Sequence, residues 1–285
     1  MNDRNFRQML EAQWSRGNFV CVGLDSDYEK IPEVAEMKLF SIGGKITSFN
    51  SAVVNATKDL VCAYKPNTAF YEAYGTEGWV ALRQTIEHIH QVAPDVPVIL
   101  DAKRADIGNT NNGYVQMAFD KLGADAITVH SYLGAEALQP FLARAEKGIF
   151  VLCRTSNPGA GEFQDMPVAT DWAPDGTMPF YQYVAFKVAK DWNKNGNCAV
   201  VVGATYPEEL RQVRQIVGDM PILIPGIGAQ GGDVEKTVSA GKDSRGKGMI
   251  INSSRGIIFA SKGADFAEAA RRETAKLCAM INKYR

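Results

Sequence analysis

A cluster of charged residues follows a short apolar segment in the first half of the chain. The apolar residues Val96–Leu100 are followed directly by Asp101, Lys103 and Asp106. If a strand continues through residue 103, alternation places Asp101 and Lys103 on one face. Two unit charges about 4 Å apart interact by about 4 kcal/mol at an effective dielectric of about 20. Such a cluster can transfer a proton or stabilise developing charge, whereas the alternative interpretation is a solvated charged face at a helix start.

Polar residues also follow other apolar segments, at the end where each segment stops. Asp25 and Lys65 end the first two segments, and Thr155–Asn157 follows the fifth. Ordinary surface loops are polar at both ends of strands, so they do not explain charged groups that recur at one end. The one-sided pattern therefore favours a functional site.

The last two strand ends have the composition of a phosphate-binding site. Gly226–Gly232 follows one apolar segment, and Asn252–Gly256 follows the next. Glycines let backbone amides approach an anion, and a helix N-terminus adds a favourable dipole. The guanidinium of Arg255 matches phosphate oxygens. A glycine-rich stretch alone also fits an ordinary turn, but together with Arg255 it predicts a phosphate site.

The elements that must position these residues alternate between strands and helices. Short apolar runs, expected to be buried parallel strands, occur at Phe19–Leu24, Leu60–Tyr64, Val98–Leu100, Ala126–Val129, Ile149–Cys153, Ala199–Val202, Ile222–Ile224 and Met249–Ile251. Helical periodicity occurs at Gln84–Val92, Tyr114–Leu122, Ala135–Ala145, Tyr181–Trp192, Glu208–Val217 and Phe266–Ile281. Eight such units predict an α/β fold, a (β/α)8 TIM barrel, with an N-terminal capping helix near residues 3–16.

The barrel is expected to form a single catalytic domain over residues 1–285, because no Pro/Gly/Ser linker divides the chain. Two connections after strands are long, from Asp25 to about Lys45 and from Arg154 to Met178. Both leave the strand ends where barrels carry their chemistry. Loops of this length in compact domains are often lids, with a plain surface insertion as the alternative. The parts expected to close over the site are the loop at 154–178 and the loop that carries Gln230.

Composition excludes several classes of partner. The 31 lysines and arginines nearly balance the 32 aspartates and glutamates, which gives no general attraction to nucleic acid or an anionic membrane. The N-terminus resembles neither a signal nor a transit peptide, and no segment is apolar enough to span a membrane. The five cysteines match no zinc spacing and the three histidines are scattered, so we expect no metal site and a cytoplasmic protein with reduced thiols.

Taken together, these motifs resemble those of the orotidine 5'-phosphate decarboxylase family, in particular its longer bacterial branch (type 2). The resemblance spans most of the chain and is carried by Gly23–Asp25, Tyr64–Asn67, the Asp-x-Lys-x-x-Asp segment at 101–106, Thr155–Gly159, Pro225–Gly232 and Ser254–Gly256. The charged hexad also occurs in sister sugar-phosphate enzymes, and its combination with the other two loops is what points to this family.

The resemblance implies loss of carbon dioxide from orotidine 5'-phosphate without metal or cofactor, giving uridine 5'-phosphate in de novo pyrimidine biosynthesis. It implies that Lys103 donates a proton to the pyrimidine carbon that loses its carboxylate. Asp101 would face the substrate carboxylate, and Lys65 would link the ribose to this charge network. Asp106 would complete the catalytic set.

The same resemblance implies the substrate-binding residues and an assembly. Asp25 would bind a ribose hydroxyl, Ser156 the pyrimidine, and Gln230 with Arg255 the phosphate. Asp106 and Thr110 would reach the ribose of the neighbouring subunit's substrate, so the implied active form is a homodimer with shared sites.

Three other interpretations compete with this one. A magnesium-dependent keto-sugar-phosphate decarboxylase or synthase shares the barrel and the hexad, but a metal site gains from a carboxylate where this chain has Lys65. A Schiff-base aldolase needs a neutral lysine, whereas two aspartates near Lys103 favour its charged form. The third, from another class, is a non-catalytic phosphate-binding barrel.

Overall fold

The structure is a computed structural model that describes residues 4–34, 40–227 and 231–285. Within these residues, eight parallel strands form a sheet in the order β2-β1-β10-β9-β8-β5-β4-β3. Parallel bridges from Tyr64 to Val98 and from Asn67 to Asp101 join β2 to β3 and close the barrel. The barrel strands are β1 (Val20–Leu24), β2 (Val61–Pro66), β3 (Ile99–Arg104), β4 (Ala126–Val129), β5 (Gly148–Arg154), β8 (Cys198–Val202), β9 (Ile222–Pro225) and β10 (Met249–Ser253).

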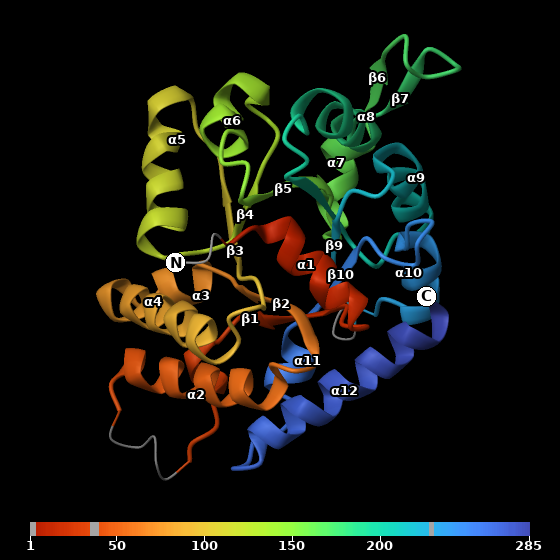
Figure 1. Cartoon of the computed structure of the whole chain (residues 1–285). Coiled ribbons are helices and arrows are strands. Elements are labelled where there is room, and N and C mark those ends of the chain that lie inside the picture. Colours follow the sequence, from red (N-terminus) through yellow and green to blue (C-terminus); the bar gives the residue numbers. More distant parts are fainter. Residues whose placement is uncertain (1–3, 35–39, 228–230) are drawn as a thin grey trace.

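Helices surround this barrel, as Figure 1 shows. They are α1 (Phe6–Ser15), α2 (Ile42–Thr57), α3 (Ala69–Glu72), α4 (Gly75–Val92), α5 (Gly108–Val115), α6 (Gly134–Leu142), α7 (Gly161–Gln164), α8 (Phe180–Lys187), α9 (Pro207–Val217), α10 (Val234–Gly241), α11 (Arg255–Ile258) and α12 (Phe266–Tyr284). Short π-helical turns extend α5 over Gln116–Lys121 and α8 over Val188–Trp192. The predicted TIM barrel is confirmed, and α2, which the sequence analysis did not propose, begins inside the predicted loop at 25–45.

The observed strands extend beyond the apolar runs into polar residues. β2 continues through Lys65, β3 through Arg104 and β10 through Ser253. Apolar patterning stops where side chains begin to face a polar cavity, but the backbone ladder does not depend on side-chain polarity. Lys65, Asp101 and Lys103 therefore belong to the strands themselves, and strands position side chains more rigidly than loops do.

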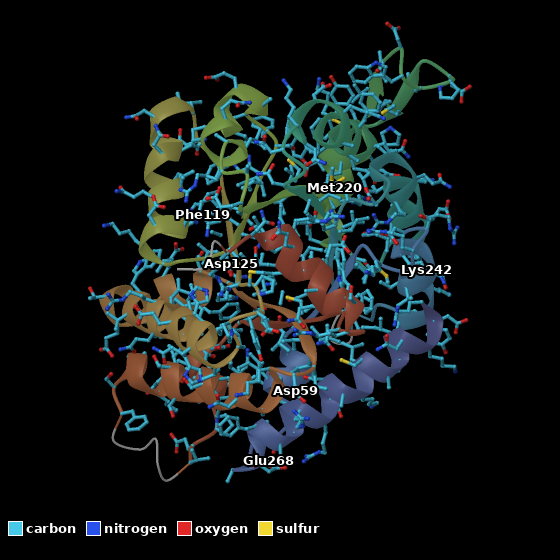
Figure 2. The ribbon with its side chains drawn as sticks, viewed as in Figure 1. Asp59, Phe119, Asp125, Met220, Lys242 and Glu268 are labelled. Carbon is cyan, nitrogen blue, oxygen red and sulfur yellow. The ribbon has the colours of Figure 1, made fainter. Side chains whose placement is uncertain are left out.

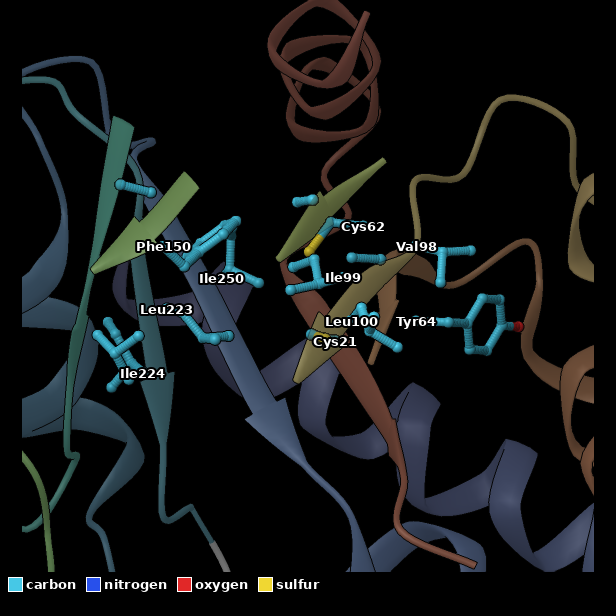
Figure 3. Packing of buried hydrophobic residues seen from close by; sticks show 14 of the residues in the cluster. Cys21, Cys62, Tyr64, Val98, Ile99, Leu100, Phe150, Leu223, Ile224 and Ile250 are labelled. Atoms are coloured by element: carbon cyan, nitrogen blue, oxygen red, sulfur yellow. The ribbon is translucent and has the colours of Figure 1, made fainter. Parts of the chain in front are cut away.

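The core consists of apolar side chains on both sides of the strands. Figure 3 shows part of it, where Cys21, Leu100 and Ile250 come from three different strands. All five cysteines are free, and burial raises the pKa of Cys21 to about 12. Such a thiol is neutral at physiological pH and acts as a small apolar side chain.

The predicted N-terminal capping helix is confirmed as α1, which crosses the strands in Figure 1. Its Phe6 ring packs edge-on against Phe150 of β5, and the indole of Trp14 donates a hydrogen bond to the carbonyl of Met249. Just before the helix, Arg4 donates two hydrogen bonds of 2.8 Å to Asp125, which Figure 2 labels. These contacts hold α1 against the end of the barrel where the strands begin.

Asp125 makes this contact dependent on pH. Burial opposes its charge, but hydrogen bonds from Arg4, the nearby His90 ring at 3.7 Å, the charge of Arg4 and a hydrogen bond from the amide of Val98 lower its pKa to about 2. Lys147 is the other cation that faces it. Because the folded pKa lies below that of the unfolded chain, the ion pair stabilises fully above pH about 4 and its contribution is lost as pH falls to about 2.

Arg4→Gln should therefore destabilise the protein most at neutral pH. The part that depends on Asp125 ionisation is worth about 2 kcal/mol and should fall by about half between pH 7 and pH 3. Urea unfolding of both proteins at pH 7, 4 and 3 measures this difference. An equal destabilisation at every pH would show that Arg4 acts only through its hydrogen bonds to the carbonyls of Pro94 and Val96.

The long connection after β5 contains structure of its own. It holds the 3₁₀ turn Pro158–Ala160, the short helix α7 and an antiparallel hairpin of β6 (Pro167–Ala169) and β7 (Thr177–Pro179). Trp172 in this hairpin stacks on Phe186 of α8 with ring centroids 4.0 Å apart. The hairpin is thus attached to the helical layer. Within this connection, the residues between β5 and β6 remain the candidate for closing over the site.

Candidate active site

A cavity of about 440 Å³ lies at the ends of the strands where the polar residues gather. Six of the nine predicted site residues line it: Asp25, Lys65, Asp101, Lys103, Ser156 and Arg255. They come from the residue after β1, from β2 and β3, from the loop after β5 and from α11, which are far apart in the sequence. The barrel brings them together because all of its strands run in the same direction.

An alternating row of charges forms one side of this cavity. The carboxylate of Asp101 contacts two ammonium groups, Lys65 Nζ at 2.9 Å and Lys103 Nζ at 2.7 Å. Lys65 Nζ also lies 3.6 Å from Asp25 Oδ1. The Lys65 side chain is only 4% exposed, whereas that of Lys103 is 50% exposed. The buried lysine thus links two carboxylates, while the other lysine reaches into the cavity.

The coupled groups at the centre of this row are charged. Burial opposes the charge of Lys65, but Asp101 and Asp25 together hold its pKa above the usual lysine value. Burial likewise favours the neutral form of Asp101, and the two lysines outweigh it and lower the pKa of that carboxyl well below its usual range. At neutral pH the site therefore presents fixed charges to whatever binds.

A distortion of β3 directs Asp101 and Lys103 into the cavity. Leu100 pairs with Ile127 and Arg104 pairs with Val129, so the three residues Asp101–Lys103 face one residue of β4. Lys103 has a φ of +48°, a left-handed conformation that costs a non-glycine residue about 1–2 kcal/mol. The prediction that Asp101 and Lys103 share a face is confirmed, but a bulge produces it and regular strand alternation does not.

The other charged residues of the hexad point elsewhere. Arg104 forms an ion pair with Glu72 of α3 and lies over the ring of Tyr114. Asp106 accepts a hydrogen bond of 2.6 Å from the next backbone amide and does not line the cavity. Thr110 is exposed on α5 and is also absent from the cavity wall. Within one chain, the structure therefore leaves two predicted site residues outside the site.

The predicted phosphate end places Arg255 at the wall of the cavity. Arg255 is exposed and begins α11, a helix of only four residues. At α10, the side chain of Asp233 already accepts a hydrogen bond from the amide of Lys236 and so occupies the helix N-terminus. The helix N-terminus expected for the phosphate stays a prediction, and Arg255 lies in the cavity wall together with Gly226. Gln230 lies outside the described residues.

The remaining walls combine an apolar surface with polar groups from two loops. Leu152, Val201 and Leu223 line the cavity beside Ser156. A side chain at Gly203 would place its Cβ 2.7 Å from that of Ser156, so glycine lets the loop after β5 lie against the next strand. This part of the cavity therefore offers a ligand apolar contact on one side and a hydroxyl on another.

The sequence analysis missed one polar cavity residue, Thr128, and gave another, Asn252, no role beyond its place in the predicted phosphate segment. Thr128 of β4 donates a hydrogen bond of 2.9 Å to Asp101, and its only sequence signal is a hydroxyl within an apolar strand. Asn252 of β10 is 6% exposed, and its Oδ1 has no hydrogen-bond partner among the described residues. Asp25 Oδ1 is also without a hydrogen bond there, although Lys65 is near. Both oxygens can accept from hydroxyl groups of a ligand.

This arrangement defines a class: a (β/α)8 barrel with a fixed row of charges at one side of its cavity and a guanidinium at another. The model of the orotidine 5'-phosphate decarboxylase / HUMPS family matches residues 18–272. The chain therefore belongs to this family, and the resemblance inferred from the motifs is confirmed.

Curated relatives and solved structures agree with this assignment. The chain is 50% identical over 281 residues to orotidine 5'-phosphate decarboxylase of Ralstonia pickettii, covering 98% of this chain and 99% of the relative. It is 47% identical to that of Cellvibrio japonicus, covering 98% of each. The solved Leishmania donovani OMP decarboxylase has a TM-score of 0.81 and 35% identity, covering 97% of this chain and 98% of that one. Leishmania donovani UMP synthase gives 0.85 and 37%, covering 99% of this chain but 56% of that one.

Proposed function

We propose that this protein converts orotidine 5'-phosphate to uridine 5'-phosphate and carbon dioxide. The observation that carries the proposal is Asp101, a carboxylate held between Lys65 and Lys103 at the wall of a cavity that also contains Arg255. Relatives that are 47–50% identical over nearly the whole chain carry the name of this activity.

In the reaction, the bond between the pyrimidine ring and its carboxylate breaks, and the electron pair stays on the ring carbon. Lys103 then gives a proton to that carbon, while carbon dioxide leaves. Asp101 faces the departing carboxylate, so repulsion between them is relieved as carbon dioxide forms. The fixed charges thus favour the transition state over the bound substrate, which is the condition for acceleration. The exposed side chain of Lys103 can regain its proton from solvent.

The rest of the cavity binds the remaining parts of the substrate. We assign a ribose hydroxyl to Asp25, whose Oδ1 has no hydrogen bond among the described residues, and the pyrimidine to Ser156. Arg255 and Gln230 bind the phosphate in this proposal. Binding energy from the phosphate can order the loop after β5 and pull the reacting carbon against the charges. The buried ammonium of Lys65 contacts the carboxylates of both Asp25 and Asp101 and holds them in place.

The test of this function is the ultraviolet absorbance decay of orotidine 5'-phosphate in excess chelator. We expect full activity there, because an ammonium already neutralises the two carboxylates that a metal ion would use, Lys65 lying between Asp25 and Asp101. Loss of activity in chelator, with turnover of a keto-sugar phosphate on adding magnesium, would support the sister enzymes instead. Nucleotide binding without turnover would support a non-catalytic barrel.

We further propose a homodimer in which each chain completes its partner's site. Asp106 and Thr110 lie outside their own cavity, and next to them Ile107 is 65% exposed. Tyr132, which follows β4, is 84% exposed. Large apolar side chains exposed beside unused polar residues suit a contact with a second copy of this chain. Asp106 and Thr110 would then face the ribose of the partner's substrate.

Mixing two inactive variants tests the shared site. Lys103→Ala and Asp106→Ala should each be weakly active alone, but a refolded equal mixture should recover about a quarter of wild-type activity, because half the dimers are mixed and each has one intact site. Sedimentation measures the dimer independently. A mixture no more active than the separate variants would contradict the shared site.

Two further expectations are proposals of organisation and location. We propose that residues 1–285 form one catalytic domain and that the protein works in the cytoplasm. Among the residues that the structure describes, no helix is both long and apolar enough to span a bilayer. The cytoplasmic location is supported by the five free cysteines, a pattern typical of reducing compartments.

A further inference from the structure

A threonine of β4 connects the two central charged residues of the site. Thr128 is 1% exposed and lies next to the bulge of β3. Its Oγ1 is 2.9 Å from Asp101 Oδ1 and also 2.9 Å from the backbone nitrogen of Lys103. One hydroxyl therefore contacts the side chain of one residue and the main chain of the other.

The directions of these hydrogen bonds are determined by chemistry. The amide of Lys103 can only donate, so Thr128 must accept from it. An ionised carboxylate can only accept, so the single hydroxyl proton must point to Asp101. Both capacities of the hydroxyl are used at once, and neither bond can form in the opposite sense. The hydroxyl thus couples the ionised state of Asp101 to the backbone position of Lys103.

The bulge explains why this contact is needed. The regular ladder between β3 and β4 stops after Leu100 and resumes at Arg104. Lys103, with its left-handed φ of +48°, therefore directs its amide away from a ladder carbonyl and toward Thr128. The hydroxyl takes the place of the missing ladder partner and satisfies the amide in the strained conformation.

We propose that Thr128 is a positioning residue for the decarboxylation, which holds the Asp101 carboxylate and the Lys103 backbone in the geometry that the charge row requires. This proposal rests on the function proposed above. Thr128 supplies a neutral donor to Asp101 Oδ1, the same oxygen that Lys103 Nζ contacts at 2.7 Å. Without it, the carboxylate and the strained segment that carries the ammonium can move relative to each other.

Two substitutions separate the hydroxyl from the shape of the side chain. Thr128→Val keeps the branched shape and removes the hydroxyl, whereas Thr128→Ser keeps the hydroxyl. We expect Thr128→Val to lower kcat by roughly tenfold to a hundredfold, the loss typical of a hydrogen bond to a charged group. The KM should change by less than about threefold, because the phosphate and ribose contacts remain. Thr128→Ser should recover most of kcat.

Thr274→Val is the matched control. Thr274 is fully buried in α12, far from the site in sequence and fold, and its hydroxyl donates to the carbonyl of Ala270. The same chemical change there should leave kcat unaltered. If Thr128→Val keeps wild-type kcat, or if Thr128→Ser is as slow as Thr128→Val, the positioning role is refuted.

An additional measurement does not depend on turnover. Hydrogen exchange of the Lys103 amide can be followed by NMR in protein labelled with ¹⁵N-lysine, with Lys103→Arg identifying the resonance. The exchange should be roughly tenfold faster in Thr128→Val than in wild type and restored in Thr128→Ser. Unchanged exchange would overturn the proposed contact. If the wild type fails to decarboxylate while exchange responds as expected, the proposed function fails and the contact stands.

Discussion

Replacing Lys103 by alanine should lower kcat for orotidine 5'-phosphate by roughly a thousandfold or more. The variant loses the proton donor, and general acid catalysis alone contributes about 10²–10⁴-fold. It also loses the only one of the two ammonium groups at Asp101 that reaches far into the cavity, since Lys65 is buried. The absorbance decay of the substrate under saturating conditions measures the change.

Binding and backbone geometry should change little in this variant. Alanine carries a Cβ as lysine does, so the left-handed backbone at position 103 is strained to the same degree. Affinity for uridine 5'-phosphate should stay within about tenfold, because the ribose and phosphate contacts are elsewhere. Lys276→Ala is the matched control, since Lys276 is 66% exposed and lies on α12. A Lys103→Ala enzyme within tenfold of wild type would refute the assigned proton donor.

Asp101→Asn should impair both activity and stability. We expect kcat to fall by at least about a hundredfold, because the carboxylate that faces the departing group loses its charge. We also expect a loss of about 3 kcal/mol in the free energy of unfolding, since breaking the buried ion pair leaves Lys65 with only the more distant carboxylate of Asp25. Urea unfolding at pH 7 measures this loss.

The control for stability is an exposed ion pair. Asp59 contacts Arg271 at 2.6 Å, but both side chains are about half exposed. Asp59→Asn should therefore cost less than about 1 kcal/mol. If Asp101→Asn costs no more than this, the buried row of charges is held by the surrounding barrel and does not contribute to stability. An increase in stability combined with loss of activity would show that the charges are retained for catalysis alone.

These two predictions concern the same physical conflict. A buried carboxylate between two ammonium groups is stable only if the attraction between the charges exceeds the free energy lost when the groups leave water, and this requires good geometry. The same lack of water makes the charges effective on a bound substrate. Asp101 satisfies both demands through three donors, namely the two lysines and Thr128. Fixed donors also spare the site from reorganising during the reaction.

The sequence alone was sufficient for the architecture and for most of the site. Runs of apolar residues indicate buried parallel strands, and each run can be recognised from neighbouring residues alone. The positions of all barrel strands were therefore predicted to within a few residues. Because parallel strands end on one rim, polar residues after each run predicted that Asp25, Lys65, Asp101 and Lys103 would meet. Resemblance to a family then gave these residues their roles.

Only the tertiary structure decided how these residues are held. The bulge in β3, the left-handed Lys103 and the bridging hydroxyl of Thr128 depend on a neighbouring strand that lies about 25 positions away in the chain. Likewise, the contact of the Asp233 side chain with the amide of Lys236 at the start of α10 is not evident from the glycine-rich pattern before it. Patterns along a chain record burial and direction, whereas hydrogen-bond geometry arises from contacts between distant segments, and that is why it became visible only in the folded barrel.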